Sequence, residues 1–172
     1  MTAQGGRIMQ SWWVAALICC SVHVGANESR LRAPWVWGQV QHVTDGDTIW
    51  VMPQGGREPV KLRLQGMDAP EMCQFWGPQS RAALMGLLPN GHWVMVHRQA
   101  TDVYGREVAE VYAGGVNVAA WMILNGHAWA DERQVRWLAL QRQAQWAHRG
   151  LFSAPAIRPQ DFRRWRGSCH GA

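Results

Sequence analysis

Apolar and polar residues alternate in the first half of the chain in a pattern that predicts β-strands. In "PVKLRLQGM", Val60, Leu62 and Leu64 face one side of an extended segment, and the residues between them are polar. The preceding stretch "QVQHVTDGDTIWVM" is rich in β-branched residues, and "PQGGRE" between the two has the proline and glycines of a turn. We therefore expect residues 40–52 to pair antiparallel with residues 59–66.

The spacing of apolar residues becomes helical three times further along. "GPQSRAALMGLL" predicts a helix with Pro78 in its first turn, and "VAAWMILNG" predicts one that Asn117 can cap. Residues 132–148 predict a third helix, which Gly150 ends. The strands "HWVMVHRQ" and "EVAEVYAGGVNV" lie between the first two helices. A chain of 172 residues with this order favours one domain of the α+β class, a β-barrel with helices packed on it.

The first 26 residues have the composition of an export signal. Arg7 precedes the apolar run "WWVAALICCSV", and "VGA" at residues 24–26 has the small residues that a signal peptidase accepts. We expect cleavage to leave a periplasmic or secreted protein without stable membrane insertion, because the run is short for a membrane span. An uncleaved anchor stays open as an alternative, and a lipoprotein signal at Cys19 or Cys20 is a weaker one.

The chain then divides into four parts. We expect a signal peptide at residues 1–26, a linker or draped N-terminal segment at residues 27–38, the folded domain at residues 39–153, and a basic C-terminal tail at residues 154–172. We expect the mature protein to be a monomer.

Two cysteines, Cys73 and Cys169, remain after such a cleavage. An even pair in an oxidising compartment is a candidate disulfide, and two unrelated thiols are the alternative. Neither cysteine has the neighbours of a zinc site. A bond between them would hold the C-terminal segment beside the loop that contains Glu71.

The chain is basic, with 17 Lys and Arg residues against 12 Asp and Glu and a net charge of +5. All but one of the basic residues are arginines, whose planar guanidinium groups suit phosphate oxygens. This charge favours a polyanionic partner such as nucleic acid, although charge alone is a weak signal.

Three carboxylates are predicted to meet at one end of the hairpin. The antiparallel pairing would bring Asp47 of "TDGDTIW" close to Asp68 and Glu71 of "MDAPE". Adjacent carboxylates repel one another unless a cation lies among them, and calcium or magnesium suits a site made of oxygen ligands. The alternative is that Asp45 opens an ordinary turn and that Asp68 is a loop residue.

Two arginines favour a catalytic role for this carboxylate cluster. Arg63 lies on the strand that leads to Asp68, and the loop "TDVYGR" supplies Arg106. Phosphodiester hydrolysis needs carboxylates, a metal ion and guanidinium groups, because its transition state accumulates negative charge. Taken singly, Arg63 is also compatible with a solvated strand face and Arg106 with a surface ion pair.

Four motifs resemble, in order and spacing, those of the staphylococcal nuclease (thermonuclease) family. They are "DGDT" at 45–48, "RLQGMDAPE" at 63–71, "TDVYGR" at 101–106 and "WMILNGHAWA" at 121–130. The likeness runs from about Gln39 to about Phe152. It implies an OB-fold barrel of five strands with three packed helices, dependence on Ca2+, and cleavage of DNA and RNA to 3′-phosphorylated products. OB-folds also commonly bind oligonucleotides.

The resemblance implies roles for the acidic segment. Asp47 and Asp68 match the calcium carboxylates of the family, and Ala69 matches a residue that ligates through its backbone carbonyl. Family members often have threonine there, so alanine loses a hydroxyl but keeps the carbonyl. Glu71 matches the carboxylate that activates or positions the attacking water.

The resemblance also implies how substrate is bound, with two departures. Arg63 and Arg106 match the pair that binds the scissile phosphate, and Tyr104 matches a tyrosine near the nucleotide phosphate. Val103 replaces a lysine of the best-known family member, and residues 131–132 are acidic where that member has two tyrosines beside the base. Metal and phosphate chemistry therefore transfers more readily than substrate preference.

Two other classes of function stay open. A non-catalytic OB-fold module could bind single-stranded nucleic acid or peptide, and a calcium-stabilised structural domain of the envelope would show no turnover. The joint presence of the five charged residues matched above favours the enzyme. Arginines in "RQVRWLALQRQAQWAHR" and "DFRRWR" could follow the backbone of a longer strand, or could form solvated helix faces. The preference for DNA or RNA and the mode of cleavage stay open.

Overall fold

The structure is a computed structural model of the chain, and it describes residues 1–2 and 35–169. Contacts between residues divide the chain between Arg30 and Leu31, and the described helices and strands belong to the second unit, Leu31–Ala172. Residues 3–26 of the expected signal peptide lie outside the described residues.

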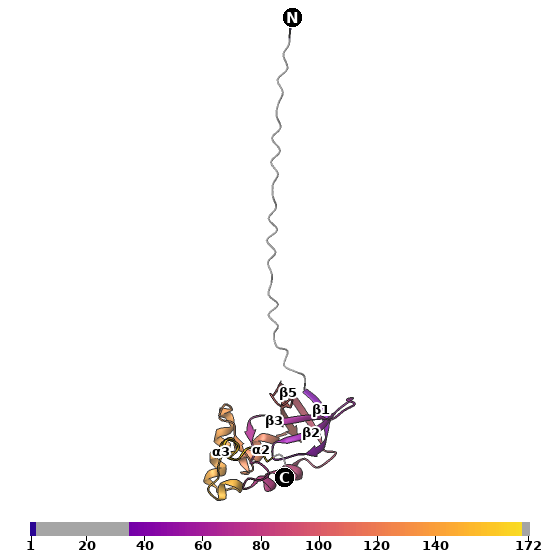
Figure 1. Cartoon of the computed structure of the whole chain (residues 1–172). Coiled ribbons are helices and arrows are strands. Elements are labelled where there is room, and N and C mark those ends of the chain that lie inside the picture. The colour runs from indigo at the N-terminus through magenta and orange to yellow at the C-terminus, as the bar shows by residue number, and fades with distance from the viewer. Residues whose placement is uncertain (3–34, 170–172) are drawn as a thin grey trace. The chain divides into compact units, whose positions relative to one another are not determined.

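The second unit is built on a closed β-barrel (Figure 1). Its strands are β1 (Trp35–Val43), β2 (Thr48–Pro53), β3 (Val60–Leu64), β5 (Trp93–Thr101) and β6 (Glu107–Ala113). They follow one another in the order β3-β2-β1-β5-β6, and parallel pairing of β3 with β6 closes the ring. A five-stranded barrel with packed helices is the OB-fold architecture, so the expected α+β fold class is confirmed.

Three short strands complete the β-structure that the described residues contain. β7 (Val116–Asn117) extends the sheet beyond β6, and β4 (Met67–Asp68) pairs with β8 (Trp129–Ala130) in a separate ladder. This ladder follows directly after β3 in the chain and fixes the start of the "MDAPE" segment. Asp68 pairs with Trp129 in it, which ties the acidic segment to the region before the last helices.

The three expected helices are present: α1 (Gly77–Leu87), α2 (Val118–Leu124) and α3 (Val135–Trp146). Pro78 lies in the first turn of α1, and the side chain of Asn117 caps α2 by accepting a hydrogen bond from the Ala120 amide at 3.0 Å. α3 begins three residues later than expected, because Asp131 accepts a hydrogen bond from the Arg133 amide and holds a turn there. None of the described helices is long and apolar enough to cross a membrane.

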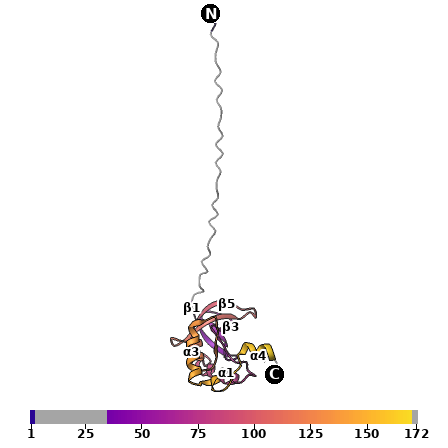
Figure 2. The same ribbon diagram turned by 90° about the vertical axis from the view of Figure 1, so that its left-hand side faces the viewer.

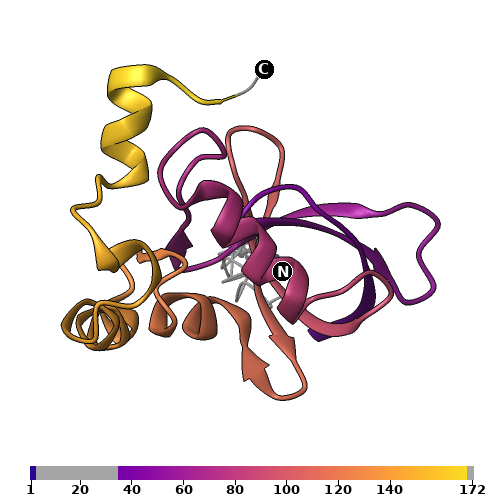
Figure 3. The ribbon, with the colours of Figure 1, turned by 90° about the horizontal axis from the view of Figure 1, so that it is seen from below.

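The chain continues past these three helices into further helical structure. A 3-10 helix, η1 (Gly150–Ser153), is followed by a fourth α-helix, α4 (Pro159–Arg166), in the segment predicted to be a basic tail. Figures 2 and 3 show α4 beside the barrel, close to the C-terminus. The predicted number of three helices is therefore too small.

The barrel core contains the residues that alternation places inside. Leu62 and Leu64 of β3 are each 2% exposed, and Ile49 of β2 is fully buried. Leu84 of α1 and Met122 of α2 close the barrel from the helical side and are also fully buried. The intervening side chains of β3 are thus left to face outward, toward the site described below.

The N-terminal strands differ from the expectation in two ways. The stretch expected to be one strand at residues 40–52 is two strands, β1 and β2, which pair with each other. Only β2 pairs with β3, with Thr48 opposite Arg63. In addition, β1 begins at Trp35, inside the segment expected to be a linker, because residues 35–39 pair with β5 and the Trp35 ring stacks on His97 with centroids 4.5 Å apart.

The turn between β1 and β2 is packed tightly against α1 at Gly46. A Cβ atom at Gly46 would lie 2.7 Å from the Cβ of Ala69 and closer still to Oγ of Ser80. Ser80 is fully buried and donates a hydrogen bond to the His127 carbonyl at 2.7 Å, so it has little freedom to move away. Glycine at this position lets the turn lie against the helix.

We expect Gly46→Ala to destabilise the protein by about 1–3 kcal/mol, because the added methyl group overpacks this contact. Gly86→Ala is the matched control: Gly86 lies in α1, and a Cβ atom added there would meet no heavy atom within 4 Å, so alanine should stabilise by about 0.5–1 kcal/mol. Urea denaturation measures both changes. Equal unfolding midpoints for Gly46→Ala and the wild type would contradict the tight packing.

Candidate active site

An open pocket of about 400 Å³ lies at the end of the β2–β3 hairpin. Four segments contribute to it: the β1–β2 turn, the stretch from β3 to Met72, the loop before β6, and the residues that begin with Arg163 on α4. The charged side chains that line it are Asp45, Asp47, Lys61, Arg63, Glu71, Arg106 and Arg163. The pocket thus combines carboxylates with several cationic groups.

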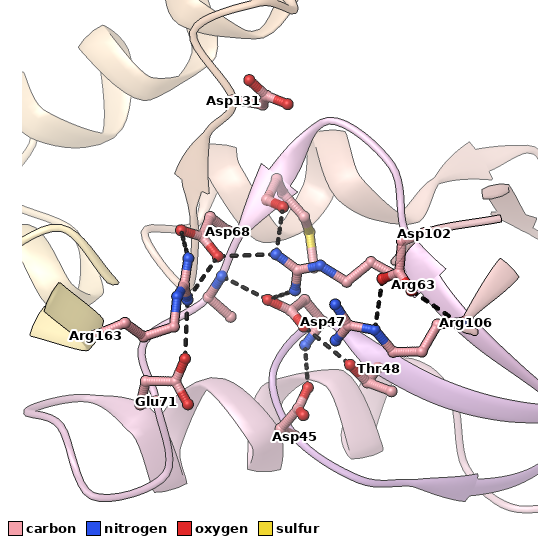
Figure 4. A network of polar contacts seen from close by, with 12 residues as sticks. Asp45, Asp47, Thr48, Arg63, Asp68, Glu71, Asp102, Arg106, Asp131 and Arg163 are labelled. Carbon is pink, nitrogen blue, oxygen red and sulfur yellow. Dashed lines mark hydrogen bonds and ion pairs between the residues drawn. The ribbon is translucent and has the colours of Figure 1, made fainter. Parts of the chain in front are cut away.

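Arg63 lies between two carboxylates at the base of the site (Figure 4). Its Nη1 pairs with Oδ2 of Asp47, and its Nη2 donates to Oδ1 of Asp68 at 2.8 Å. Burial lowers the pKa of Arg63, and the charge of Asp68 opposes that effect. An arginine stays protonated in either case, so Arg63 neutralises part of the acidic cluster.

Asp47 is held by its own neighbours as well. Its Oδ1 accepts from the Thr48 hydroxyl at 3.0 Å, and its Oδ2 accepts from the Ala69 amide at 2.9 Å. The Asp47 residue is 5% exposed. These hydrogen bonds and the pair with Arg63 hold the carboxylate in place and join β2 to the "MDAPE" segment.

Arg163 of α4 bridges Asp68 and Glu71 (Figure 4). Its Nη2 donates to Oδ2 of Asp68 at 3.0 Å, and its Nη1 donates to Oε1 of Glu71 at 2.8 Å. Partial burial opposes the charge of Arg163, but the hydrogen bonds and charges of the two carboxylates outweigh it and raise the pKa of Arg163. The guanidinium is therefore stabilised where it lies.

Arg106 faces the pocket from the loop before β6. Its Nε donates to Oδ2 of Asp102 at 2.7 Å, and its guanidinium carbon lies 5.3 Å from the centre of the Tyr104 ring. Desolvation of Asp102 is outweighed by hydrogen bonds from the amide and side chain of Arg106 and from the Tyr104 amide, so the pKa of Asp102 is lowered. Asp102 thus orients Arg106. The two Nη groups of Arg106 make no hydrogen bond with any described residue.

The donors expected for calcium are present but are engaged by arginines. Asp47 and Asp68 offer the hard carboxylate oxygens that calcium prefers, with Ala69 beside them. Both oxygens of Asp68 accept hydrogen bonds from guanidinium groups, and Oδ2 of Asp47 pairs with Arg63. Among residues 1–2 and 35–169, no group of three or more His, Cys, Asp or Glu side chains is arranged to hold a metal ion. The chemistry of the donor set fits calcium, whereas its present arrangement is that of an arginine-paired site.

The predicted residues of the site lie together, with Arg163 as an addition that sequence reasoning missed. Asp47, Ala69 and Glu71 line the pocket together with Arg63, Tyr104 and Arg106; Asp68 is not part of the lining but accepts hydrogen bonds from two lining residues, Arg63 and Arg163. Nothing in the local pattern around Arg163 indicates such a role. The cysteine pair was the available signal, because Cys73 follows Glu71 by two residues and Cys169 follows Arg163 by six.

Cys73 and Cys169 are joined by a disulfide bond with their Cα atoms 5.8 Å apart. The two residues are separated by 96 positions, and the chain-entropy model gives such a loop about 4–5 kcal/mol of stabilisation. The bond places the C-terminal segment beside the loop that carries Glu71, and both Ser168 and Cys169 line the pocket.

The acidic pair at the expected base-binding position lies elsewhere. Asp131 forms an ion pair with Arg133, which lowers the pKa of Asp131 through a side-chain hydrogen bond, and Glu132 pairs with Arg158 at 2.9 Å. Neither Asp131 nor Glu132 lines the pocket, and Figure 4 shows Asp131 apart from the network. Tyr104 is the aromatic residue that the described chain contributes to the pocket lining.

Comparison with known proteins identifies the family. Residues 61–154 match the family described as staphylococcal nuclease homologue. Protein ParB of Escherichia coli is 36% identical over 142 residues, which cover 74% of this chain and 78% of that protein. An uncharacterized endonuclease of Escherichia coli O157:H7 is 38% identical over 122 residues, covering 69% of this chain and 78% of the relative. A probable staphylococcal-like nuclease of Oryza sativa subsp. japonica is 36% identical over 111 residues, covering 60% of this chain and 29% of that longer protein.

The family match covers more than half of the chain and includes all but the first residue of β3, the "MDAPE" segment and the loop that carries Arg106. These are the parts from which most of the pocket is built. Together with the closed five-stranded barrel, the match shows that this chain belongs to the staphylococcal nuclease family.

Proposed function

We propose that this protein is a nuclease that hydrolyses phosphodiester bonds of DNA, RNA or both, and leaves 3′-phosphorylated products. The observation that supports this most directly is the convergence of Glu71, Asp47 and Arg106 in one open pocket of a staphylococcal nuclease fold. Relatives that carry the names endonuclease and staphylococcal-like nuclease support the same reaction class.

In the proposed reaction a water molecule attacks phosphorus and the bond to the 5′-oxygen breaks. Glu71 accepts a proton from the attacking water or holds that water in position, and the leaving 5′-oxygen gains a proton. The Oε1 atom of Glu71 is engaged by Arg163, whereas Oε2 makes no hydrogen bond with the described residues. Oε2 is therefore the oxygen that can bind the water.

Arg106 is the arginine best placed for the phosphate. Asp102 holds its Nε, so both Nη groups can donate to phosphate oxygens as negative charge accumulates on them. Arg63 lines the same pocket, but its Nη groups are already paired with Asp47 and Asp68. Arg63 can turn to the phosphate only when another cation compensates these carboxylates.

We propose calcium as that cation, with Asp47, Asp68 and the backbone carbonyl of Ala69 as its protein ligands. Bound calcium would supply positive charge next to the phosphate and lower the barrier to attack. The proposal is supported by the hard oxygen donors of the cluster and by the family to which the chain belongs.

We further propose that the protein is exported and acts in the periplasm or outside the cell. The bond between Cys73 and Cys169 supports this location, because structural disulfides persist in oxidising compartments. The order of Arg7 and an apolar run within the first 26 residues agrees with this location.

The proposed metal dependence can be tested with purified protein on single- and double-stranded DNA and RNA. We expect activity with calcium, loss of activity in excess chelator, and loss of activity in Asp47→Asn, since an amide is a weaker ligand than a carboxylate. Glu58→Gln is the charge-matched control, because Glu58 is exposed in the β2–β3 turn, and it should keep wild-type activity. Full activity in chelator would rule out the metal site, and binding without cleavage under all conditions would favour a non-catalytic module.

Glu71→Gln should lower turnover by about 10²-fold or more while substrate affinity stays similar, because only the transition state needs the carboxylate. Arg106→Ala should also lower turnover, since the charge it stabilises increases toward the transition state. Steady-state kinetics measures both. Arg57→Gln, an exposed change of the same charge, should leave turnover unaltered. Either active-site variant with wild-type turnover would lose its proposed role.

A single nucleotide should bind weakly, because Tyr104 is 80% exposed and Val103 replaces the lysine of the best-known relative. We expect weak inhibition by a nucleoside 3′,5′-bisphosphate, and affinity for polymeric substrate that falls at least about tenfold between about 50 and 200 mM salt. Val103→Lys should strengthen the inhibition, whereas Val116→Lys on β7 should not. Tight inhibition of the wild-type enzyme would show that the nucleotide pocket is built from other residues.

A further inference from the structure

Glu71 depends on a residue outside the region that matches the family. The matched residues end at position 154, and Arg163 lies beyond them on α4. Arg163 is nevertheless the residue that holds the Glu71 carboxylate, at 2.8 Å, among all the described residues. Arg63 pairs with Asp47 and Asp68, and Arg106 pairs through Nε with Asp102; neither makes a hydrogen bond with Glu71.

Three contacts join the C-terminal segment to the loop that carries Glu71. Before α4, the carbonyl of Ile157 accepts a hydrogen bond from Nε2 of Gln74 at 2.6 Å. Within α4, Arg163 pairs with Glu71, and after α4 the disulfide joins Cys169 to Cys73. The loop contributes Glu71, Cys73 and Gln74, so three of the four residues from position 71 to position 74 are tied to the same C-terminal segment.

The start of α4 is anchored independently of that loop. The residue before the helix is Arg158, which pairs with Glu132 at 2.9 Å. Its guanidinium carbon also lies 4.9 Å from the centre of the Trp129 ring, and Trp129 is opposite Asp68 in the β4–β8 ladder. The residue before α4 is therefore held by Glu132 and Trp129, and the residues after α4 are held by the loop that carries Glu71.

These attachments give Arg163 a defined position between two acidic side chains. It donates to Oε1 of Glu71 and to both oxygens of Asp68, and it leaves Oε2 of Glu71 without a hydrogen bond to any described residue. A glutamate side chain that is held by one oxygen has lost most of its rotamer freedom, which is what the positioning of a water molecule requires. The Arg163 side chain is 35% exposed and lines the pocket, so the bridge forms part of the pocket wall.

We propose that Arg163 is a positioning residue of the active site, held in place by the Cys73–Cys169 disulfide, and that it fixes the Glu71 carboxylate for reaction. The C-terminal segment from Ile157 to Cys169 is then a part of the active site and not a tail. The proposal rests on the proposed nuclease function for its kinetic consequences, while the ordering of the Glu71 loop by Arg163 holds whatever reaction the site performs.

The kinetic test compares Arg163→Gln and Arg163→Lys with the wild type in the oxidised, full-length mature protein. Arg163→Gln should lower turnover about 10²-fold with KM changed by less than about threefold, since a misplaced base affects the chemical step. Arg163→Lys should be intermediate, because an ammonium group can pair with one carboxylate but does not reproduce the planar bridge. Arg57→Gln is the control for the loss of one positive charge at an exposed position.

A rescue experiment separates positioning from a merely structural contribution. Free guanidinium ion at millimolar concentration should restore part of the turnover of Arg163→Ala, and ammonium at the same concentration should restore less. The same guanidinium addition should not restore Glu71→Gln. If substitution of Arg163 changed KM alone, Arg163 would be a substrate-binding residue. If substitution made turnover faster and calcium binding tighter, Arg163 would be an inhibitory residue. Either result overturns the proposal.

Hydrogen exchange tests the contact without any activity. Peptides that cover residues 69–76 should exchange faster in Arg163→Gln and in the Cys73→Ser, Cys169→Ser double variant than in wild type, while peptides of β5 should not change. Unchanged exchange in Arg163→Gln overturns the positioning role, and unchanged exchange in the double variant overturns the role of the disulfide. If the variants exchange faster but the wild type cleaves no nucleic acid, the proposed nuclease is refuted and the contact stands.

Discussion

The active site depends on the pairing of nearly buried carboxylates with guanidinium groups. The side chains of Asp47 and Glu71 are 7% and 17% exposed, and that of Asp68 is 20% exposed. Charges with so little water around them are costly unless they are paired and hydrogen-bonded. Arg63 meets this requirement for Asp47 and Asp68, and Arg163 meets it for Asp68 and Glu71. The pairing fixes where β2, β4 and α4 must lie relative to one another.

This constraint explains which parts of the fold could be predicted from the sequence. β3 pairs with β2 on one side and with β6 on the other, so its alternation directs Leu62 into the barrel and Lys61 and Arg63 toward the pocket. Alternation is a local property of the chain, and it predicts the hairpin and the meeting of the acidic segments. The helices α1 and α2 are predictable for the same reason, through Pro78 and the Asn117 cap.

The parts that sequence reasoning misses depend on contacts between distant residues. The stretch "QVQHVTDGDTIWVM" has strand-forming residues on both sides of its turn, and only the pairing of β1 with both β2 and β5 decides that the chain reverses there. Arg163 and Glu71 are 92 positions apart, so no periodicity relates them. Their meeting follows from the disulfide and from the anchoring of α4 by Arg158, which are tertiary effects.

The balance of charge in the site favours the binding of a metal ion. The pocket lining and the carboxylates that pair with its arginines comprise five carboxylates and four basic side chains: Asp45, Asp47, Asp68, Glu71 and Asp102 against Lys61, Arg63, Arg106 and Arg163. A phosphodiester would bring a further negative charge into a site that is already slightly acidic, and like charges at this separation repel strongly where water is scarce. A divalent cation compensates both the excess and the substrate. That cation needs oxygens of Asp47 and Asp68 that Arg63 now holds, and the incoming phosphate offers Arg63 a new partner, while Arg163 keeps its contact with Glu71. Metal and substrate therefore favour each other's binding under the proposed function.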